Sequence, residues 1–417
     1  MVINMCEYNN VPKIRFKGFT DVWEQRKFGT LCSIVTKQTG FDYTSTIKKS
    51  LLTTSSSDTI PYLQTKNFCG INIDYNTDYF IPKSIAKDFP KINLNEKCLL
   101  FSIVGASVGN IGFFPGKIHC FLSGAICVSK FLNPNDAEYL YHFMCSNSGQ
   151  NQIQTCTKGG AQATVTIEDI RNFNVDLSSN EETIKIGKFL SSIDNLITLH
   201  QRKCDTLVNA KKSLLEKMFP KNSSNIPEIR FKEFTDVWEQ RKFGDYGTVS
   251  MCKRIFKNET SDSGDIPFYK IGTFGGKADA FISNEKYEYY KSKFSYPNKG
   301  DILLSASGTI GRIVEYTGEK AYFQDSNIVW LNHNEDIKNV FLKVLYPTVK
   351  WDGIEGSTIK RLYNSNFLNT CINIPNTLEQ EKIGELFTNL DNLITLHQRK
   401  LEKLKNIKKS MLDKMFV

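Results

Sequence analysis

The chain lacks the short signals that mark secretion, membrane insertion and structural metal binding. Its first ten residues hold no basic region followed by an apolar run, so we expect no signal peptide. No window approaches the roughly 18 apolar residues of a membrane span, and we expect no membrane association. The cysteines number 11, an odd count, and no two have CxxC spacing. This pattern favours reduced thiols in a cytoplasmic protein over a disulfide framework or a zinc site.

Signatures of catalysis are missing as well. There is no GxGxxG after a strand, no GxxxxGK[ST] phosphate loop, no GxSxG and no HExxH. The Asp/Asn-Pro-Pro-aromatic motif with which amino-methyltransferases hold a flipped base is also absent. Acidic residues are plentiful, so a nuclease carboxylate pair stays open on sequence alone. The balance favours a binding protein.

Charge and length set broad bounds on partners and domains. Lys and Arg outnumber Asp and Glu by 53 to 44, which gives a formal net charge of +9. Such an excess suits a polyanionic partner, although a basic protein without one fits the charge equally well. With 417 residues, of which 40% are hydrophobic, the chain is long enough for two or more domains.

What the sequence does contain is an internal repeat. VPKIRFKGFTDVWEQRKFG (Val11–Gly29) matches IPEIRFKEFTDVWEQRKFG (Ile226–Gly244) at 16 of 19 positions, with an offset of 215 residues. DNLITLHQRK at Asp194–Lys203 recurs unchanged at Asp391–Lys400, with an offset of 197. Each half therefore consists of what we call a leading segment, a long body and a closing segment.

The two bodies share only sparse landmarks. IPYLQTKNF parallels IPFYKIGTF, and GASVGNIG parallels SGTIGRIV with Gly109 opposite Gly311. Strands are predicted at CLLFSIV, NIGFF and AICVSKFL in the first body, and at DILLSAS, RIVEY and NIVWL in the second. We therefore expect two mixed α/β bodies that share a fold and differ in surface.

The closing segments have the pattern of long helices. Ser179-x-x-Glu182 and Thr377-x-x-Gln380 fit capping boxes, and about 39 residues at 1.5 Å each give a rod of roughly 58 Å. A seven-residue period, flanked by apolar residues such as Leu196 and Leu393, predicts a coiled-coil seam. We expect the two helices to pack antiparallel; the alternative is that each packs only on its own body. The predicted seam is Ile186, Ile193, His200, Leu207, Leu214, Ile383, Leu390, His397, Leu404 and Met411, with both histidines as core residues rather than metal ligands.

The leading segments are better suited to packing than to phosphate binding. The first copy has a net charge of +3 and the second a net charge of zero, whereas a phosphate clamp is not expected to lose its charge balance. The aromatic residues are constant instead. We expect them to anchor each body to the helices or to a partner protein: Phe16, Phe19, Trp23 and Phe28, matched by Phe231, Phe234, Trp238 and Phe243.

Taken together, these twin segments resemble the specificity subunit of type I restriction–modification enzymes, over essentially the whole chain. The motifs that carry the resemblance are the twin leading segments, the DNLITLHQRK helices ending in KKSLLEKMFP and KKSMLDKMFV, and the glycine turns. The resemblance implies an α/β (α+β) protein with target recognition domains at 1–180 and 221–376. Two long antiparallel coiled-coil helices, at 181–220 and 377–417, would join them with pseudo-twofold symmetry.

In that family each recognition domain reads one half of a bipartite, asymmetric site in double-stranded DNA, and the helices set the spacing. Two modification (methyltransferase) subunits methylate adenine with S-adenosylmethionine, and two restriction subunits can join to give an ATP- and Mg-dependent nuclease. The resemblance thus implies a non-catalytic, cytoplasmic, DNA-binding subunit with no cofactor of its own. Two alternatives stay open: a self-contained DNA methyltransferase or endonuclease with unrecognised motifs, and a coiled-coil scaffold for proteins only.

Candidate base-contacting residues are the polar and basic side chains of the landmark loops, because Arg, Lys, Gln and Asn can reach base edges. For each of them an ordinary solvated surface residue is an equally good interpretation. The candidates are Gln64, Lys66, Asn67, Ser107, Asn110, Lys158 and Gln162 in the first body, and Lys270, Thr309, Arg312, Lys360 and Arg361 in the second.

Overall fold

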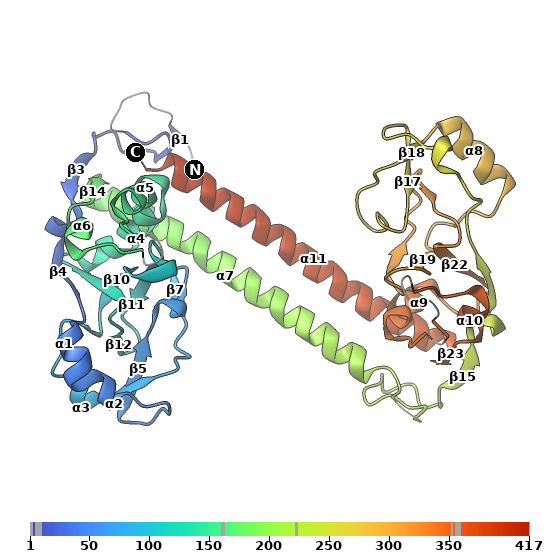
Figure 1. Ribbon diagram of the computed structural model, residues 1–417, viewed down its shortest axis with the longest axis horizontal. Helices are drawn as coiled ribbons and strands as arrows, with labels where there is room; N and C mark the ends of the chain where they lie inside the picture. Colours follow the sequence, from blue (N-terminus) through green and yellow to red (C-terminus); the bar gives the residue numbers. More distant parts are fainter. Residues whose placement is uncertain are drawn as a thin grey trace. The chain divides into compact units, whose positions relative to one another are not determined.

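The structure is a computed structural model that describes residues 3–4, 11–159, 163–221, 224–351, 353–354 and 360–416. The chain divides into two compact units, the first made of residues 1–202 and 398–417, the second of residues 203–397. Each unit therefore contains one body, the start of the helix that follows this body and the end of the helix that follows the other body (Figure 1).

The first body is built on a four-stranded antiparallel sheet with the order β11-β10-β13-β4. Its central strands, β10 (Lys97–Ser102) and β13 (Ile126–Phe131), are buried almost throughout, as expected for continuous apolar runs. Together with β11 (Ile111–Pro115), they confirm the three predicted strands of this body. The edge strand β4 (Cys32–Lys37) was not predicted.

A second sheet packs against the first and shares its core. Its order is β8-β5-β12-β9, with β5 and β12 parallel and the other pairs antiparallel. Leu63 and Phe121 of this sheet lie in one buried cluster with Leu100 and Phe114 of the first sheet. The strands are β5 (Thr59–Leu63), β8 (Phe80–Pro82), β9 (Asn93–Leu94) and β12 (Cys120–Leu122).

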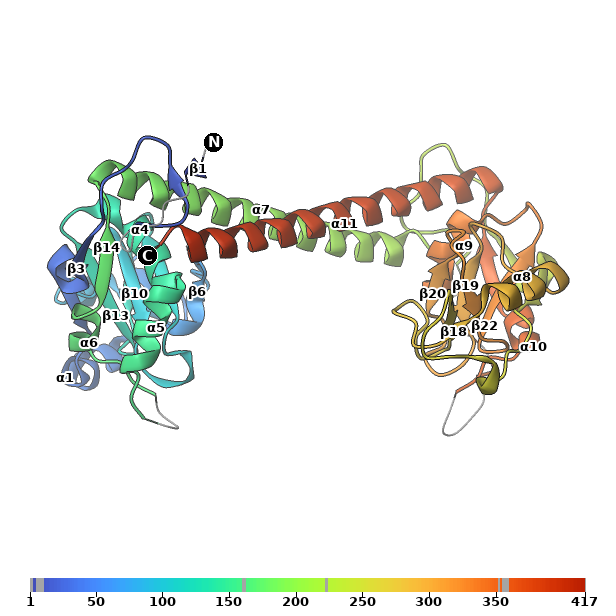
Figure 2. The same cartoon turned by 90° about the horizontal axis from the view of Figure 1, so that it is seen from above.

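Short helices complete the first body. Residues of α4 (Ala137–Cys145) and α5 (Asn147–Cys156) share a buried cluster with Leu99 and Phe101 of β10. Figure 2 shows the ribbons of both helices next to that of β10. The remaining elements are β1 (Ile3–Asn4), β2 (Arg15–Phe16), α1 (Gly40–Asp42), a π-helical turn (Tyr43–Ile47), α2 (Lys48–Ser50), β6 (Phe68–Cys69), β7 (Asn72–Ile73), α3 (Lys83–Ala86) and α6 (Ile167–Arg171).

The second body repeats this topology with one strand fewer in its second sheet. Its main antiparallel sheet has the order β16-β22-β19-β20, and its second sheet, β18-β17-β21, again contains one parallel pair, β17 with β21. The three predicted strands are confirmed as β19, β20 and β22. The elements are β16 (Gly247–Ser250), β17 (Ile266–Tyr269), β18 (Phe281–Ile282), α8 (Asn284–Lys293), β19 (Ile302–Ser305), β20 (Ile313–Glu315), β21 (Tyr322–Phe323), β22 (Ile328–His333), α9 (Asn339–Leu345) and α10 (Asn364–Asn369).

The leading segments are packing elements, as predicted. In the first unit β3 (Glu24–Lys27) pairs with β14 (Asn174–Leu177); in the second, β15 (Glu239–Lys242) pairs with β23 (Cys371–Ile374). The tryptophan that precedes each strand is buried, at an edge-on angle to an aromatic ring of α4 or α9. The centroid distances are 6.2 Å for Trp23–Tyr139 and 6.0 Å for Trp238–Phe341.

An arginine of each leading segment forms an ion pair with the helix that follows the body. Arg15 binds Glu182 through Nε–Oε1 at 2.7 Å and Nη2–Oε2 at 2.8 Å, and both side chains are buried. Arg230 and Glu379 repeat this pair at 2.7 and 2.6 Å. Two-point pairing of a guanidinium with a carboxylate fixes direction as well as distance, so each pair orients the leading segment on the first turn of the helix.

The two helices, α7 (Asn180–Lys217) and α11 (Thr377–Lys414), are each 38 residues long. The capping box predicted for α7 is only half formed. Ser179 Oγ accepts the Glu182 N–H at 3.4 Å, but the Glu182 carboxylate binds Arg15 instead of the Ser179 backbone.

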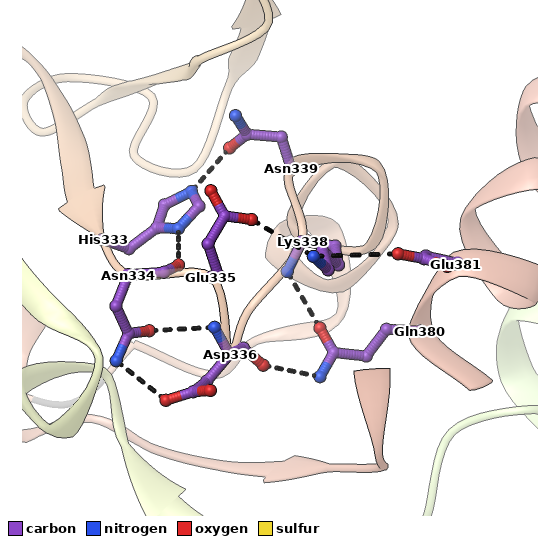
Figure 3. A network of polar contacts seen from close by, with 8 residues as sticks. All are labelled: His333, Asn334, Glu335, Asp336, Lys338, Asn339, Gln380 and Glu381. Atoms are coloured by element: carbon purple, nitrogen blue, oxygen red, sulfur yellow. Dashed lines mark hydrogen bonds and ion pairs between the residues drawn. The ribbon is translucent and has the colours of Figure 1, made fainter. Parts of the chain in front are cut away.

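In α11 the predicted capping box is wrong, because Asn376 is the cap. Its Oδ1 accepts the Glu379 N–H at 2.9 Å. Gln380 turns outward from the helix: its Oε1 accepts the Lys338 N–H at 2.9 Å and its Nε2 donates to Asp336 O at 3.0 Å (Figure 3). The glutamine predicted to cap the helix thus ties its first turn to the loop before α9.

The helices pair with each other inside both units. In the first unit Asp194 Oδ1 of α7 lies 2.6 Å from Lys408 Nζ of α11. In the second, Lys211 Nζ of α7 lies 2.5 Å from Asp391 Oδ1 of α11. The two pairs are equivalent in the repeat, because Asp391 corresponds to Asp194 and Lys408 corresponds to Lys211 at the same offset of 197 residues. The start of each helix meets the end of the other, so the pairing is antiparallel, as predicted.

The end of each helix also packs on the other body. Phe416 lies 5.4 Å from the Tyr139 ring in the first unit, and Phe219 lies 5.8 Å from the Trp238 ring in the second. Ile14 N–H donates to Lys414 O at 2.9 Å in the first unit, and Ile229 N–H donates to Lys217 O at 3.0 Å in the second. The leading segment of each body therefore also binds the end of the helix that follows the other body. The alternative in which each helix packs only on its own body is therefore wrong.

Within the predicted seam, burial varies along the helices. Ile186, Ile193 and Ile383 are buried. The other seven positions are half-buried: His200, Leu207, Leu214, Leu390, His397, Leu404 and Met411. The flanking residues Leu196 and Leu393 do not belong to the seam, since each remains 44% exposed.

Candidate DNA-recognition surface

In the first body a glycine turn follows the central strand β10. Gly105 and Gly109 have φ angles of +81° and +92°, which residues with a Cβ rarely adopt. Gly109 N–H donates to Ser102 O at 3.3 Å, and Ser102 N–H donates to Asn110 O at 2.9 Å. The turn is thus closed by its own backbone, and it presents the exposed side chain of Asn110 at its end.

The second body has the same turn with one residue fewer. Gly311, with φ +88°, donates its N–H to Ser305 O at 3.1 Å, and Ser305 N–H donates to Arg312 O at 2.8 Å. Arg312 lies seven residues after Ser305, whereas Asn110 lies eight after Ser102. The predicted match of Gly109 with Gly311 is confirmed, and Asn110 and Arg312 occupy equivalent positions.

Two short stretches of chain, around Lys158 and Thr164, lie beside the turn of the first body. Gly105 N–H donates to Ala163 O at 2.9 Å. Lys158 and Thr164 exchange backbone hydrogen bonds of 3.0 and 2.9 Å. Lys158 is exposed there. Gln162, also predicted as a base contact, lies outside the described residues.

The second body places a corresponding segment beside its turn. Gly308 N–H donates to Lys360 O at 3.0 Å, and Ser307 pairs with Arg361. Arg361 Nη2 donates to Asn327 Oδ1 at 3.3 Å, and Ser307 Oγ donates to the same oxygen at 2.7 Å. Lys360 and Arg361 are exposed, so this edge of the second body carries two cations next to Arg312.

The other candidates of the first body have different roles. Asn67 is buried, and its Oδ1 accepts the Gln64 N–H at 2.9 Å, so it closes a turn and is no longer considered a base contact. Lys66 is exposed and forms an ion pair with Asp78. Ser107 is half-buried, with its hydroxyl 2.8 Å from Ser102 Oγ.

The second body has two further candidates, Lys270 and Thr309. Lys270 Nζ is 2.8 Å from Asp279 Oδ1, an ion pair with both side chains largely exposed. Thr309 is exposed within the glycine turn. Arg312 Nη1 donates to Phe274 O at 3.0 Å, which orients the guanidinium while leaving its remaining N–H groups available.

A cavity of about 740 Å³ opens near the end of β4 in the first body. Among its lining residues are the charged Lys37 and Lys48 and the polar Gln38 and Gln64. The sequence singled out only Gln64 of these, because Gln64 lies in a landmark segment matched between the two bodies and the other three residues do not. Asn327, which supports Arg361, was also missed, since nothing in its local sequence indicates a tertiary partner.

One buried cluster has an arrangement similar to that of a catalytic triad. His142 Nε2 is 3.2 Å from Ser191 Oγ, and its Nδ1 is 3.8 Å from Asp194 Oδ2. Burial, and second the nearby Lys408 ammonium, lower the pKa of His142 well below its ordinary value. His142 is fully buried where α4 meets the paired helices, so the cluster stabilises that junction and no substrate can reach it.

Two searches of the described residues bear on other site types. No group of three or more His, Cys, Asp or Glu side chains there could hold a metal ion. Among the described helices, none combines the length and the apolar character that crossing a membrane requires.

The fold and the surface define a protein with two related bodies and two different candidate surfaces. Two bodies of one topology each rest on a shared helix pair, and each presents different polar side chains from the same turn. The chain matches the family described as type I restriction modification DNA specificity domain twice, over residues 21–209 and 235–406.

Individual relatives agree with this match. A putative type I restriction enzyme specificity subunit of Haemophilus influenzae is 56% identical over 158 residues, which are 37% of this chain and 41% of that protein. The putative type I restriction enzyme MjaX specificity subunit of Methanocaldococcus jannaschii is 22% identical over 431 residues, which cover 99% of this chain and 97% of the relative. The crystal structure of a type I restriction-modification S subunit from M. genitalium has a TM-score of 0.61 at 17% identity, covering 98% and 99% of the two chains, and this likeness shows the fold.

The two family matches together span most of the chain. The chain belongs to the family of DNA specificity subunits of type I restriction–modification enzymes. Its role is therefore DNA sequence recognition within such an enzyme, and the chain itself is the non-catalytic subunit. The two alternatives, a self-contained DNA enzyme and a protein-only scaffold, have no support.

Proposed function

We propose that residues 1–180 and 221–376 form two target recognition domains that each read one half of a bipartite, asymmetric DNA site. The observation that carries this proposal is the shared turn with different side chains, Asn110 in one body and Arg312 in the other. One framework with two sets of donors and acceptors suits two different sequences. The proposed contacts are Gln64, Lys66, Ser107, Asn110 and Lys158 in the first body, and Lys270, Thr309, Arg312, Lys360 and Arg361 in the second.

The paired helices, at 181–220 and 377–417, would set the distance between the two half-sites. Each helix has 38 residues, about 57 Å at 1.5 Å per residue. Support comes from the equivalent ion pairs, Asp194–Lys408 and Lys211–Asp391, which join the helices in both units. A fixed separation between two readers turns the spacing of half-sites into a matter of geometry.

Two modification subunits are the proposed partners, one for each half of the internal repeat. Leu196 and Leu199 on α7 are 44% and 46% exposed, and their counterparts Leu393 and Leu396 on α11 have the same values. An identical exposed apolar surface present twice in one chain suits one protein bound twice.

The leading segments offer further repeated surface. Their residues from Thr20 to Lys27 are exposed apart from Trp23, and the second copy has the same residues in the same exposed state. Adenine methylation requires the base to leave the stack, and we assign that pocket and its S-adenosylmethionine to the modification subunits. ATP and Mg would bind to restriction subunits when two of these join, and we propose that the complex acts in the cytoplasm.

The test is methylome mapping of DNA exposed to the complex of this chain with a cognate modification subunit. The proposal predicts one bipartite motif with two unlike half-sites and a constant spacer. A complex that binds all duplexes equally at about 0.2 M salt would contradict sequence recognition, because non-specific binding depends on phosphate charge alone. Turnover by the purified chain alone, with DNA and S-adenosylmethionine or Mg²⁺, would support the self-contained enzyme instead.

A further inference from the structure

At one equivalent position the two bodies differ in the way that base reading requires. Asn110 and Arg312 each follow the last glycine of the turn, and each accepts the turn's closing hydrogen bond through its backbone carbonyl. Their main chains therefore have the same role. Only the exposed side chains differ, a carboxamide in the first body and a guanidinium in the second.

The carboxamide of Asn110 is available for an external partner. Within the described residues Asn110 contributes only its backbone to hydrogen bonds. A carboxamide places one acceptor and one donor side by side, which matches the N6 donor and N7 acceptor of adenine in the major groove. A guanine edge, with two acceptors at O6 and N7, cannot satisfy that pair.

The guanidinium of Arg312 has the opposite character. It carries only donors, and the 3.0 Å bond from Nη1 to Phe274 O positions it without using Nη2. Two donors from one guanidinium match the two acceptors of guanine.

The residues that pair with the two turns also differ in charge. Arg361, supported by Asn327, lies beside the turn of the second body. In the first body the position that pairs with the turn in the same way is the neutral Thr164. At this position the second body therefore has a cationic donor and the first has a neutral hydroxyl, with the exposed Lys158 paired to Thr164.

We infer that Asn110 reads an adenine in the half-site of the first body and that Arg312 reads a guanine in the half-site of the second. The inference rests on the proposed two-half-site function and deepens it by naming one base in each half. The adenine in question is one other than the methylated base.

Exchange of the two side chains is the first test. A complex with Arg312→Asn is expected to methylate sites in which one guanine of the second half-site has become adenine or is no longer specified. Asn110→Arg is expected to do the reverse in the first half-site. Each variant leaves the other half-site and the spacer unchanged. Lys299→Ala is the matched control, because Lys299 is an exposed lysine of the second body that is not among the proposed contacts, and it is expected to leave the motif unchanged.

A second test needs no variant to fold. Replacing the inferred guanine by 7-deazaguanine removes its N7 acceptor, and the wild-type complex is expected to bind this duplex roughly 5- to 150-fold more weakly. The Arg312→Ala complex is expected to bind the guanine and 7-deazaguanine duplexes equally, because it lacks the donor that N7 would accept from. The inference fails if every guanine of the second half-site tolerates this change, if that half-site has no guanine, or if the exchanged variants keep the wild-type motif. A wild-type complex that methylates without any bipartite motif would overturn the proposed function instead.

Discussion

Removal of Arg15 should strongly destabilise the first unit. Arg15 and Glu182 are 4% and 0% exposed, so Arg15→Ala leaves a carboxylate buried at the start of α7 without its cation. Breaking a buried pair from one side costs about 3–5 kcal/mol. The cost should be smaller for Arg230→Ala, because Arg230 is 11% exposed and water reaches the site more easily.

The assay is hydrogen exchange with increasing urea, read separately for peptides of the two units, because a single global transition is not expected of a two-unit chain. Arg26→Ala is the matched control in the same segment. Its pair with Glu24 is 52% and 66% exposed, so solvent screens the pair and its removal should change stability little. Replacing both Arg15 and Glu182 by apolar residues of similar size should recover most of the loss. Equal destabilisation by Arg15→Ala and Arg26→Ala would refute the reasoning.

Three other predictions concern acid stability, partner binding and salt. The depressed pKa of His142 keeps it neutral in the folded state, whereas the unfolded chain takes up this proton near pH 6.5. The contribution of His142 to the free energy of unfolding should therefore be complete above about pH 6.5 and decrease on acidification. His142→Val should reduce the loss of stability between about pH 7.5 and about pH 5.5, measured by urea titration. Leu196→Asp with Leu393→Asp should leave circular dichroism unchanged but abolish binding of modification subunits in native mass spectrometry; loss of helix content, or the same effect from Thr206→Asp, would argue against a docking surface. Lys360→Ala should lower the slope of log affinity against log salt by about 0.9, and an unchanged slope would exclude a phosphate contact.

The internal repeat made the two long helices and the leading segments predictable. The heptads and the twin leading segments indicated two long helices, their pairing and the buried Trp23 and Trp238, because each signal occurred twice at a constant offset. Details that depend on rotation about a helix axis were not predictable in this way. Leu196 fits a heptad as well as Ile193 does, and only the packing of the body on α7 decides which of them is covered.

Local competition explains the other differences. Asn376 and Thr377 are both good capping residues. Asn376 is the cap because Gln380, the partner that a cap at Thr377 would need, donates to Asp336 O in the loop before α9. In the candidate site, the glycines identified the turn because their φ angles exclude other residues. The burial of Asn67 depends on contacts across the body that no local pattern records.

The central claim is that the paired helices set the distance between the two half-sites. Its most direct test is to measure the spacer of the methylated motif after both helices are lengthened. Four alanines inserted after Arg202 in α7 and after Arg399 in α11, which are equivalent points of the repeat, add one turn, or about 6 Å. With base pairs about 3.4 Å apart, we predict that the complex methylates the same two half-sites with a spacer one to two base pairs longer. An unchanged spacer, or a changed half-site, would contradict the account.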